Sequence, residues 1–176
     1  MLQAGMNVAR FNFSHGTHEV RDVFVDPAAR LTGWPSSCLA PYPPNSATGF
    51  IVPQDDVIAQ TRTGKQVLNV KGDSVASVCR VVKGDHIAVV GENRKVLIFS
   101  IEELPEMGRG KGVRLQKYKD GGLSDATTFN LEEGLSWLDP AGRTRTENNL
   151  AEWIAKRASA GRMAPRGFPR DNKFTS

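Results

Sequence analysis

Short apolar runs separated by turn residues fill residues 49–146, and this spacing constrains the fold more than any other feature. Seventeen glycines and ten prolines punctuate the 176-residue chain, and these two residue types end regular elements after a few positions. Strand-like runs that recur roughly every 8–12 residues are typical of all-β domains. The spacing therefore predicts a mainly β fold of short antiparallel strands, as in a sandwich, a barrel or a propeller blade.

Two hairpins are the clearest local predictions. Residues 57–62 and 65–70 flank Thr63-Gly64, and residues 86–90 and 95–99 flank Gly91-Glu92-Asn93-Arg94. Glycine adopts the positive φ that tight hairpin turns require, which favours both assignments. Further short strands are expected over residues 50–52, 75–82, 113–118, 126–131, 135–138 and 143–146.

One helix is expected near the end of the chain. Leu150, Trp153, Ile154 and Arg157 recur at helical spacing after a possible N-cap asparagine, and Gly161 stands where a C-cap would. The predicted organisation has four parts: residues 1–24, a proline-rich linker over 25–48, a β region over 49–147, and a helix with a basic tail over 148–176.

Several function classes are excluded by composition. No run of eighteen apolar residues exists, so no membrane span is expected, and no apolar signal segment follows the N-terminus. Two cysteines, Cys38 and Cys79, form no metal-binding or disulfide pattern, which favours a reducing cytoplasm. No catalytic residue and no cofactor are predicted: His86 falls within a strand, and Tyr118 lacks the carboxylate cluster that a metal-assisted nucleophile needs.

The excess of positive charge lies entirely in the last part of the chain. Residues 1–105 contain ten basic and ten acidic residues, whereas residues 106–176 contain thirteen and nine. Clustered cations are an electrostatic footprint for phosphate backbones. The alternative is a solvated surface followed by a disordered basic tail. Candidate nucleic-acid contacts are Arg109, Lys111, Arg114, Lys117, Lys119, Arg143, Arg145, Lys156, Arg157, Arg162, Arg166 and Arg170.

A glycine at every second position marks residues 108–112. The sequence Gly108-Arg109-Gly110-Lys111-Gly112 fits neither the dinucleotide fingerprint nor a Walker loop. Two interpretations remain open: a close backbone approach to a phosphate, or a tight turn with no ligand.

Several blocks together resemble the C-terminal DNA-binding region of the A subunit of DNA topoisomerase IV. They are GKQVLNV at 64–70, GRGKGVRLQKYKDGGLSD at 108–125, GLSW at 134–137, GRT at 142–144, and the ending from Glu152 to Arg170. The resemblance covers residues 47–175 and implies partial β-pinwheel blades whose basic rim binds and bends duplex DNA. Only the closing Gly-Lys-Gly of the gyrase box is recognisable, at 110–112, which suits topoisomerase IV better than gyrase.

That resemblance also implies partners and a cellular setting. The family is an ATP- and Mg²⁺-dependent type II topoisomerase of the bacterial nucleoid. The expected partners are therefore duplex DNA and the remainder of the A and B subunits. The breakage–reunion region with its active-site tyrosine is absent from these residues, so the fragment is expected to position DNA without cleaving it.

The N-terminus resembles a different family. Residues 4–19, AGMNVARFNFSHGTHE, are similar to the first conserved motif of pyruvate kinase. The resemblance implies substrate contact by Arg10, a K⁺ site at Asn12 and Ser14, a nucleotide neighbour at His15, and Mg²⁺ as a second cofactor. A (β/α)₈ barrel needs about 250 residues. The alternatives to a DNA-binding module are therefore a truncated pyruvate kinase or two gene remnants joined in one reading frame.

Overall fold

The computed structural model describes residues 10–11, 47–53, 56, 65–67, 69, 78, 80 and 82–174. Their architecture is antiparallel β. The first short strands are β1 (Arg10–Phe11), β2 (Ala47–Gly49) and β3 (Lys65–Gln66). They are followed by β4 (His86–Gly91), β5 (Lys95–Ser100), β6 (Val113–Gln116), β7 (Leu123–Phe129), β8 (Leu135–Leu138), β9 (Thr144–Glu147) and β10 (Arg162–Met163).

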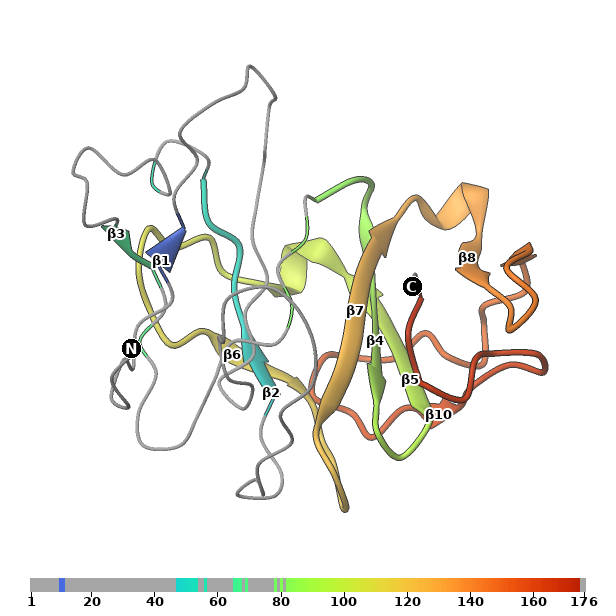
Figure 1. The fold of residues 1–176 in the computed structure, drawn as a ribbon. Helices are drawn as coiled ribbons and strands as arrows, with labels where there is room; N and C mark the ends of the chain where they lie inside the picture. Colours follow the sequence, from blue (N-terminus) through green and yellow to red (C-terminus); the bar gives the residue numbers. More distant parts are fainter. Residues whose placement is uncertain are drawn as a thin grey trace, which may run out of the picture.

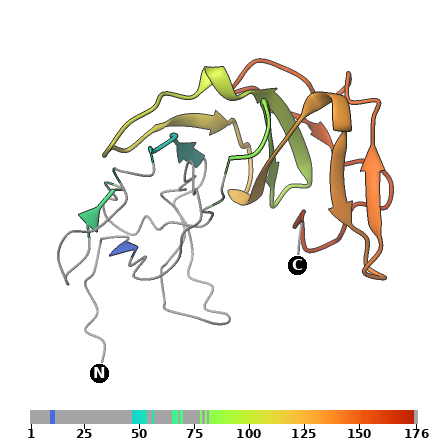
Figure 2. The same cartoon turned by 90° about the horizontal axis from the view of Figure 1, so that it is seen from above.

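Four sheets result from these pairings. The central sheet has the order β10-β5-β4-β7, and three two-stranded sheets pair β2 with β6, β8 with β9, and β1 with β3. The β2/β6 and β8/β9 pairs lie on opposite sides of the central sheet (Figures 1 and 2). Within residues 82–174 the only helical elements are two single 3-10 turns, Ile101–Glu103 and Leu131–Glu133. This arrangement confirms the predicted mainly β fold.

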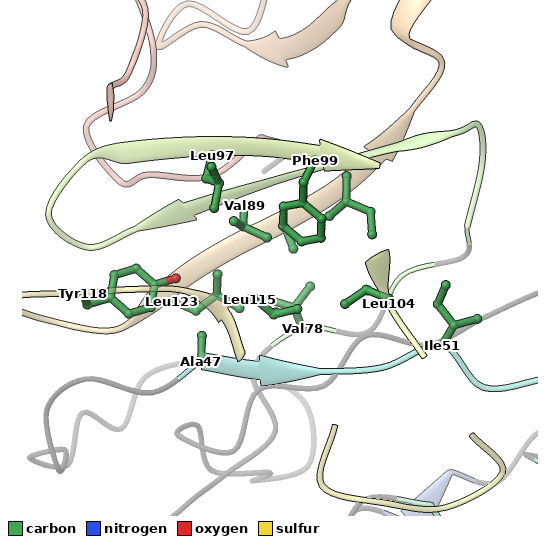
Figure 3. Packing of buried hydrophobic residues seen from close by; sticks show 12 residues of the cluster. Ala47, Ile51, Val78, Val89, Leu97, Phe99, Leu104, Leu115, Tyr118 and Leu123 are labelled. Carbon is green, nitrogen blue, oxygen red and sulfur yellow. The ribbon is translucent and has the colours of Figure 1, made fainter. Parts of the chain in front are cut away.

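The β4–β5 hairpin is buried on both faces. Ile87, Val89, Leu97 and Phe99 face one core cluster, which also contains Leu115 and Tyr118 and is shown in Figure 3. Ala88, Val90, Val96 and Ile98 face a second cluster with Leu135, Trp137, Leu150, Phe168 and Phe174. Because neighbouring sheets cover both faces, the two strands are continuous apolar runs rather than alternating ones. Each fully buried side chain of this size contributes roughly 1.5–3 kcal/mol to folding.

The predicted hairpins had different outcomes. The hairpin at 86–90 and 95–99 is confirmed, with Val90 opposite Val96 and His86 opposite Ser100. The strand predicted at 135–138 is β8, and it pairs with β9 across the turn at Pro140-Ala141-Gly142. Most of the hairpin predicted at 57–62 and 65–70 lies outside the described residues, as do Cys38 and Cys79; the described part, β3, pairs with β1.

The C-terminal helix prediction was wrong. Residues 150–154 form one turn, in which the N–H groups of Trp153 and Ile154 donate to the Leu150 carbonyl, and the chain then runs along the edge of β5. There the Ile98 N–H donates to the Trp153 carbonyl at 2.9 Å, and the Ala155 N–H donates to the Ile98 carbonyl at 3.0 Å. A short isolated helix is marginal in water, whereas a strand edge offers unpaired backbone groups, so edge pairing prevails. Ile154 consequently remains 41% exposed.

The basic C-terminal segment packs against the sheets and is not a free tail. Phe168 and Phe174 are buried, and their rings meet edge-on at 5.3 Å between centroids. The buried carboxylate of Asp125 on β7 accepts a bond from the Phe174 N–H at 2.9 Å and pairs with Arg80 at 3.3 Å. These contacts hold the end of the described chain against the central sheet.

Candidate nucleic-acid interface

Strand β6 positions the first group of candidate contacts. Leu115 and Tyr118 are buried in the first core cluster, whereas Arg114, Lys117 and Lys119 are exposed. One edge of β6 pairs with β2, where Arg114 stands opposite Thr48. Arg114 on the strand and the two lysines just beyond it therefore stay at the surface, while Leu115 and Tyr118 enter the core.

The other edge of β6 is joined by the second basic cluster. The Lys117 N–H donates to the Ser159 carbonyl at 3.0 Å, and the Ala158 N–H donates to the Leu115 carbonyl at 2.9 Å. The buried amide of Gln116 reinforces this contact by donating to the Ala160 carbonyl at 2.9 Å. Residues 157–160, about forty positions later in the chain, therefore lie directly beside β6, and the chain then continues into β10, where Arg162 stands opposite Val96 of β5.

Five exposed cations lie on these two paired segments or within two residues of their ends, and we call them the β6 surface: Lys111, Arg114, Lys117, Lys156 and Arg162. Among the residues that the structure describes, none of these five forms an ion pair. The carboxylate of Glu103 accepts a bond from the Arg157 backbone N–H at 2.9 Å. Unneutralised cations of this kind suit a polyanion.

Two predicted contacts near this surface are engaged within the protein. Arg157 is half-buried, and its guanidinium donates to the Arg114 carbonyl at 2.6 Å. Arg109 donates through Nε to the Asn69 side chain at 3.2 Å. Both side chains therefore brace the segments around β6.

The glycines at 108–112 serve close packing. Gly112 has φ +76°, and a Cβ there would lie 2.4 Å from the Gly49 carbonyl oxygen. The Gly110 N–H donates to the Val67 carbonyl, and its own carbonyl accepts from the Asn69 N–H. Gly110 is thus paired through its backbone with residues 67–69, and its amide already has a partner inside the protein.

Arg143 and Arg145 lie away from the β6 surface, at the β8–β9 turn. Both donate through Nε to Oδ2 of Asp139, each at 3.2 Å. The side chain of Asp139 is 5% exposed, whereas those of Arg143 and Arg145 are 70% and 55% exposed. The amide N–H of Arg143 is the main group that lowers the pKa of Asp139, so this carboxylate is ionised at neutral pH.

The remaining predicted contacts form a third group on the C-terminal segment, where Arg166 and Arg170 are exposed. The predicted set is thus brought together only in part. Sequence reasoning missed two features: the pairing of residues 157–160 with β6, for which no local signal exists, and the role of Asp139. The Asp-Pro-Ala-Gly turn followed by two arginines could have indicated the latter, because aspartate side chains commonly bond turn amides.

Tyr118 and His86, the two other candidates in the part of the chain that the structure describes, have contacts within the protein. Tyr118 is 3% exposed within the core, which confirms the packing role expected for it. His86 bonds through Nδ1 to Asp85 at 2.9 Å on the central sheet. Within the described ranges, no three His, Cys, Asp or Glu side chains gather in a metal-binding group, and no helix is long and apolar enough to cross a membrane. Of the pyruvate-kinase-like positions, Asn12, Ser14 and His15 lie outside the described residues.

Comparison with known proteins separates the two resemblances. A family profile described as "DNA gyrase C-terminal domain, beta-propeller" matches residues 45–79 and 85–123. The DNA topoisomerase 4 A subunit of Caulobacter vibrioides is 49% identical over 126 residues, which are 72% of this chain and 16% of that protein. Its counterpart in Rickettsia conorii is 47% identical over 128 residues, 73% of this chain and 17% of that protein. The chain thus spans about a sixth of these relatives.

Solved structures agree on the fold. The C-terminal domain of E. coli ParC superimposes with a TM-score of 0.60 at 16% identity, over 88% of this chain and 59% of that one.

Cytosolic pyruvate kinase from Solanum tuberosum is 69% identical, but only over 26 residues, which are 15% of this chain and 5% of that enzyme. The chain belongs to the family of DNA topoisomerase IV A subunits, in which it corresponds to the C-terminal β-propeller domain.

Proposed function

We propose that this domain binds the phosphate backbone of duplex DNA and positions it for a topoisomerase IV complex. The β6 surface carries this proposal, because five exposed cations follow two adjacent segments and have no carboxylate partner among the described residues. Contacts to phosphate fix the register of a duplex without reading its sequence. The domain would therefore bind DNA with little base preference.

The wider role follows from the family. The relatives are A subunits of DNA topoisomerase 4, and this chain corresponds to a small part of them. We propose that the domain holds or bends DNA during decatenation or relaxation, and that its partners are the remaining parts of the A and B subunits. Strand cleavage, ATP and Mg²⁺ then belong to those other parts, and the working location is the bacterial nucleoid.

A salt titration tests DNA binding. The affinity of the full chain for a fluorescent duplex of about 30 base pairs would be measured by anisotropy at several salt concentrations. Non-specific binding of this kind has a dissociation constant of about 10⁻⁴–10⁻⁶ M at physiological salt, and log K falls by about 0.9 per log salt for each phosphate contact. Arg114→Glu should weaken binding and reduce the slope by about 0.9.

The matched control is Lys83→Glu, which makes the same change of charge at an exposed lysine outside the β6 surface. It should leave the slope unchanged. Equal effects of the two variants would mean that only net charge matters. Absence of salt-dependent binding by the unmodified chain at low salt would refute the proposed function.

A further inference from the structure

The two oxygens of Asp139 have separate tasks. Oδ1 accepts the backbone N–H groups of Ala141 at 2.9 Å and Arg143 at 3.0 Å. Oδ2 accepts the Nε–H groups of Arg143 and Arg145, each at 3.2 Å. One oxygen therefore serves the turn, and the other serves two guanidinium groups.

The turn itself does not depend on Oδ2. The Gly142 N–H donates to the Asp139 carbonyl at 2.8 Å, and the Asp139 N–H donates to the Arg143 carbonyl at 2.8 Å. Gly142 has φ +77°, a conformation that glycine adopts without strain. Strand pairing of Leu138 with Thr144 and of Trp137 with Arg145 closes the hairpin on either side. The bonds to Oδ2 thus exceed what the hairpin needs.

The bonds to Oδ2 leave the terminal nitrogens of both guanidinium groups available to donate to a ligand. A guanidinium carries five N–H donors, of which Nε uses one. In the described part of the chain nothing accepts from the terminal nitrogens of Arg143 or Arg145, and both side chains are more than half exposed. Sharing one oxygen keeps the two Nε atoms within two hydrogen-bond lengths of each other. Two positive groups held by one carboxylate retain a net positive charge.

We propose that Arg143 and Arg145 act as one phosphodiester-binding unit and that Asp139 is its positioning residue. This proposal rests on the proposed function, and it adds a second contact on the opposite side of the central sheet from the β2/β6 pair (Figures 1 and 2). Planar guanidinium forks match the geometry of phosphate oxygens, and holding them in place before binding reduces the entropy lost on association.

Asp139→Asn is the decisive variant. The amide oxygen of asparagine can still accept the turn N–H groups in place of Oδ1, but the amide NH₂ that replaces Oδ2 cannot accept from the two arginines. The substitution raises the net charge by one, so simple electrostatics predicts tighter binding to DNA. Loss of positioning predicts weaker binding, by about 2- to 10-fold, the typical effect of one or two hydrogen bonds. Binding that is tighter or unchanged would overturn the proposal.

A second variant tests the two arginines directly and leaves Asp139 unchanged. Arg143→Lys with Arg145→Lys preserves both charges and loses the forks, and it should also weaken binding severalfold; unchanged affinity would refute the paired unit. Urea unfolding of each variant checks that the hairpin is intact. The two proposals can fail separately: if Arg114→Glu weakens binding while the Arg143 and Arg145 variants do not, the domain binds DNA without this unit.

Discussion

The β6 surface and the β8–β9 turn place similar side chains in different electrostatic settings. Along β6, Arg114 and Lys117 stand on a strand paired at both edges by backbone groups, with no carboxylate among the described residues bound to them. At the turn, Arg143 and Arg145 are tethered to a buried aspartate. The comparison shows that cations close together in the sequence can be either independent charges or an organised pair, depending on whether a turn supplies an acceptor.

Removing the support beneath the β8–β9 turn should have the largest effect. Trp137 is 4% exposed, packs on Phe168 at 5.6 Å between ring centroids, and donates from Nε1 to the Gly167 carbonyl. We expect Trp137→Ala to lower the free energy of unfolding by about 3–5 kcal/mol, measured in urea. Ser136→Ala, at an exposed position on the same strand, removes only the hydroxyl bond to Thr146 at 2.8 Å and should lower it by no more than about 0.5–1.5 kcal/mol. Equal effects would contradict the assignment of Trp137 to the core.

Support beneath β6 should be nearly as important. Leu115 is 1% exposed in the first core cluster, so Leu115→Ala is expected to lower the free energy of unfolding by about 2–5 kcal/mol. Both clusters pack on the β4–β5 hairpin, so a single shifted transition is expected for each variant. Two separate transitions would show that the sides of the molecule unfold independently. Arg114→Ala is the neighbouring control and should affect DNA binding rather than stability.

The salt dependence of DNA binding distinguishes the two basic regions, and the expected effect is smaller than the losses of stability described above. Alanine at Lys111, Arg114 and Lys117 together should reduce the slope of log K against log salt by about 2.7, and alanine at Arg143 and Arg145 by about 1.8, if each cation contacts one phosphate. Lys83→Ala should leave the slope as it is. A reduction confined to one variant would locate DNA binding on that side of the central sheet alone.

Acid should weaken the turn while sparing β6, and this is the smallest effect expected. The pKa of Asp139 lies below its ordinary value of 3.8, chiefly because the Arg143 N–H donates to the carboxylate. The folded state then binds fewer protons than the unfolded state, so the stabilisation is complete above about pH 4 and is lost as the pH falls through the folded pKa. Asp139→Asn should show a smaller loss of stability than the unmodified chain between about pH 6 and pH 3.

Local patterns predicted elements whose neighbours are close in sequence. The hairpin of β4 and β5 follows from apolar runs on either side of a glycine-containing turn and was confirmed, and the short strand predicted at 135–138 is present as β8. The helix expected from Leu150, Trp153 and Ile154 was wrong because its side-chain spacing also fits a turn followed by an extended edge segment. Spacing alone does not report that the edge of β5 is open for pairing.

For the candidate site, too, the sequence predicted the local features and missed the contacts between distant segments. The sequence indicated which cations are clustered and that Tyr118 packs rather than reacts, and it identified the family through several separate blocks. It did not indicate that residues 157–160 lie beside β6, since that contact joins segments about forty residues apart. Nor did it separate Arg143 and Arg145 from the other cations.

The order and short length of the strands and the excess of positive charge in the second half were determined by the sequence itself, because turn residues and side-chain charge act locally. Tertiary structure alone decided which cations of the two basic clusters lie beside each other. The backbone pairing of β6 with residues 157–160 depends on segments that meet only when the core closes around β4 and β5.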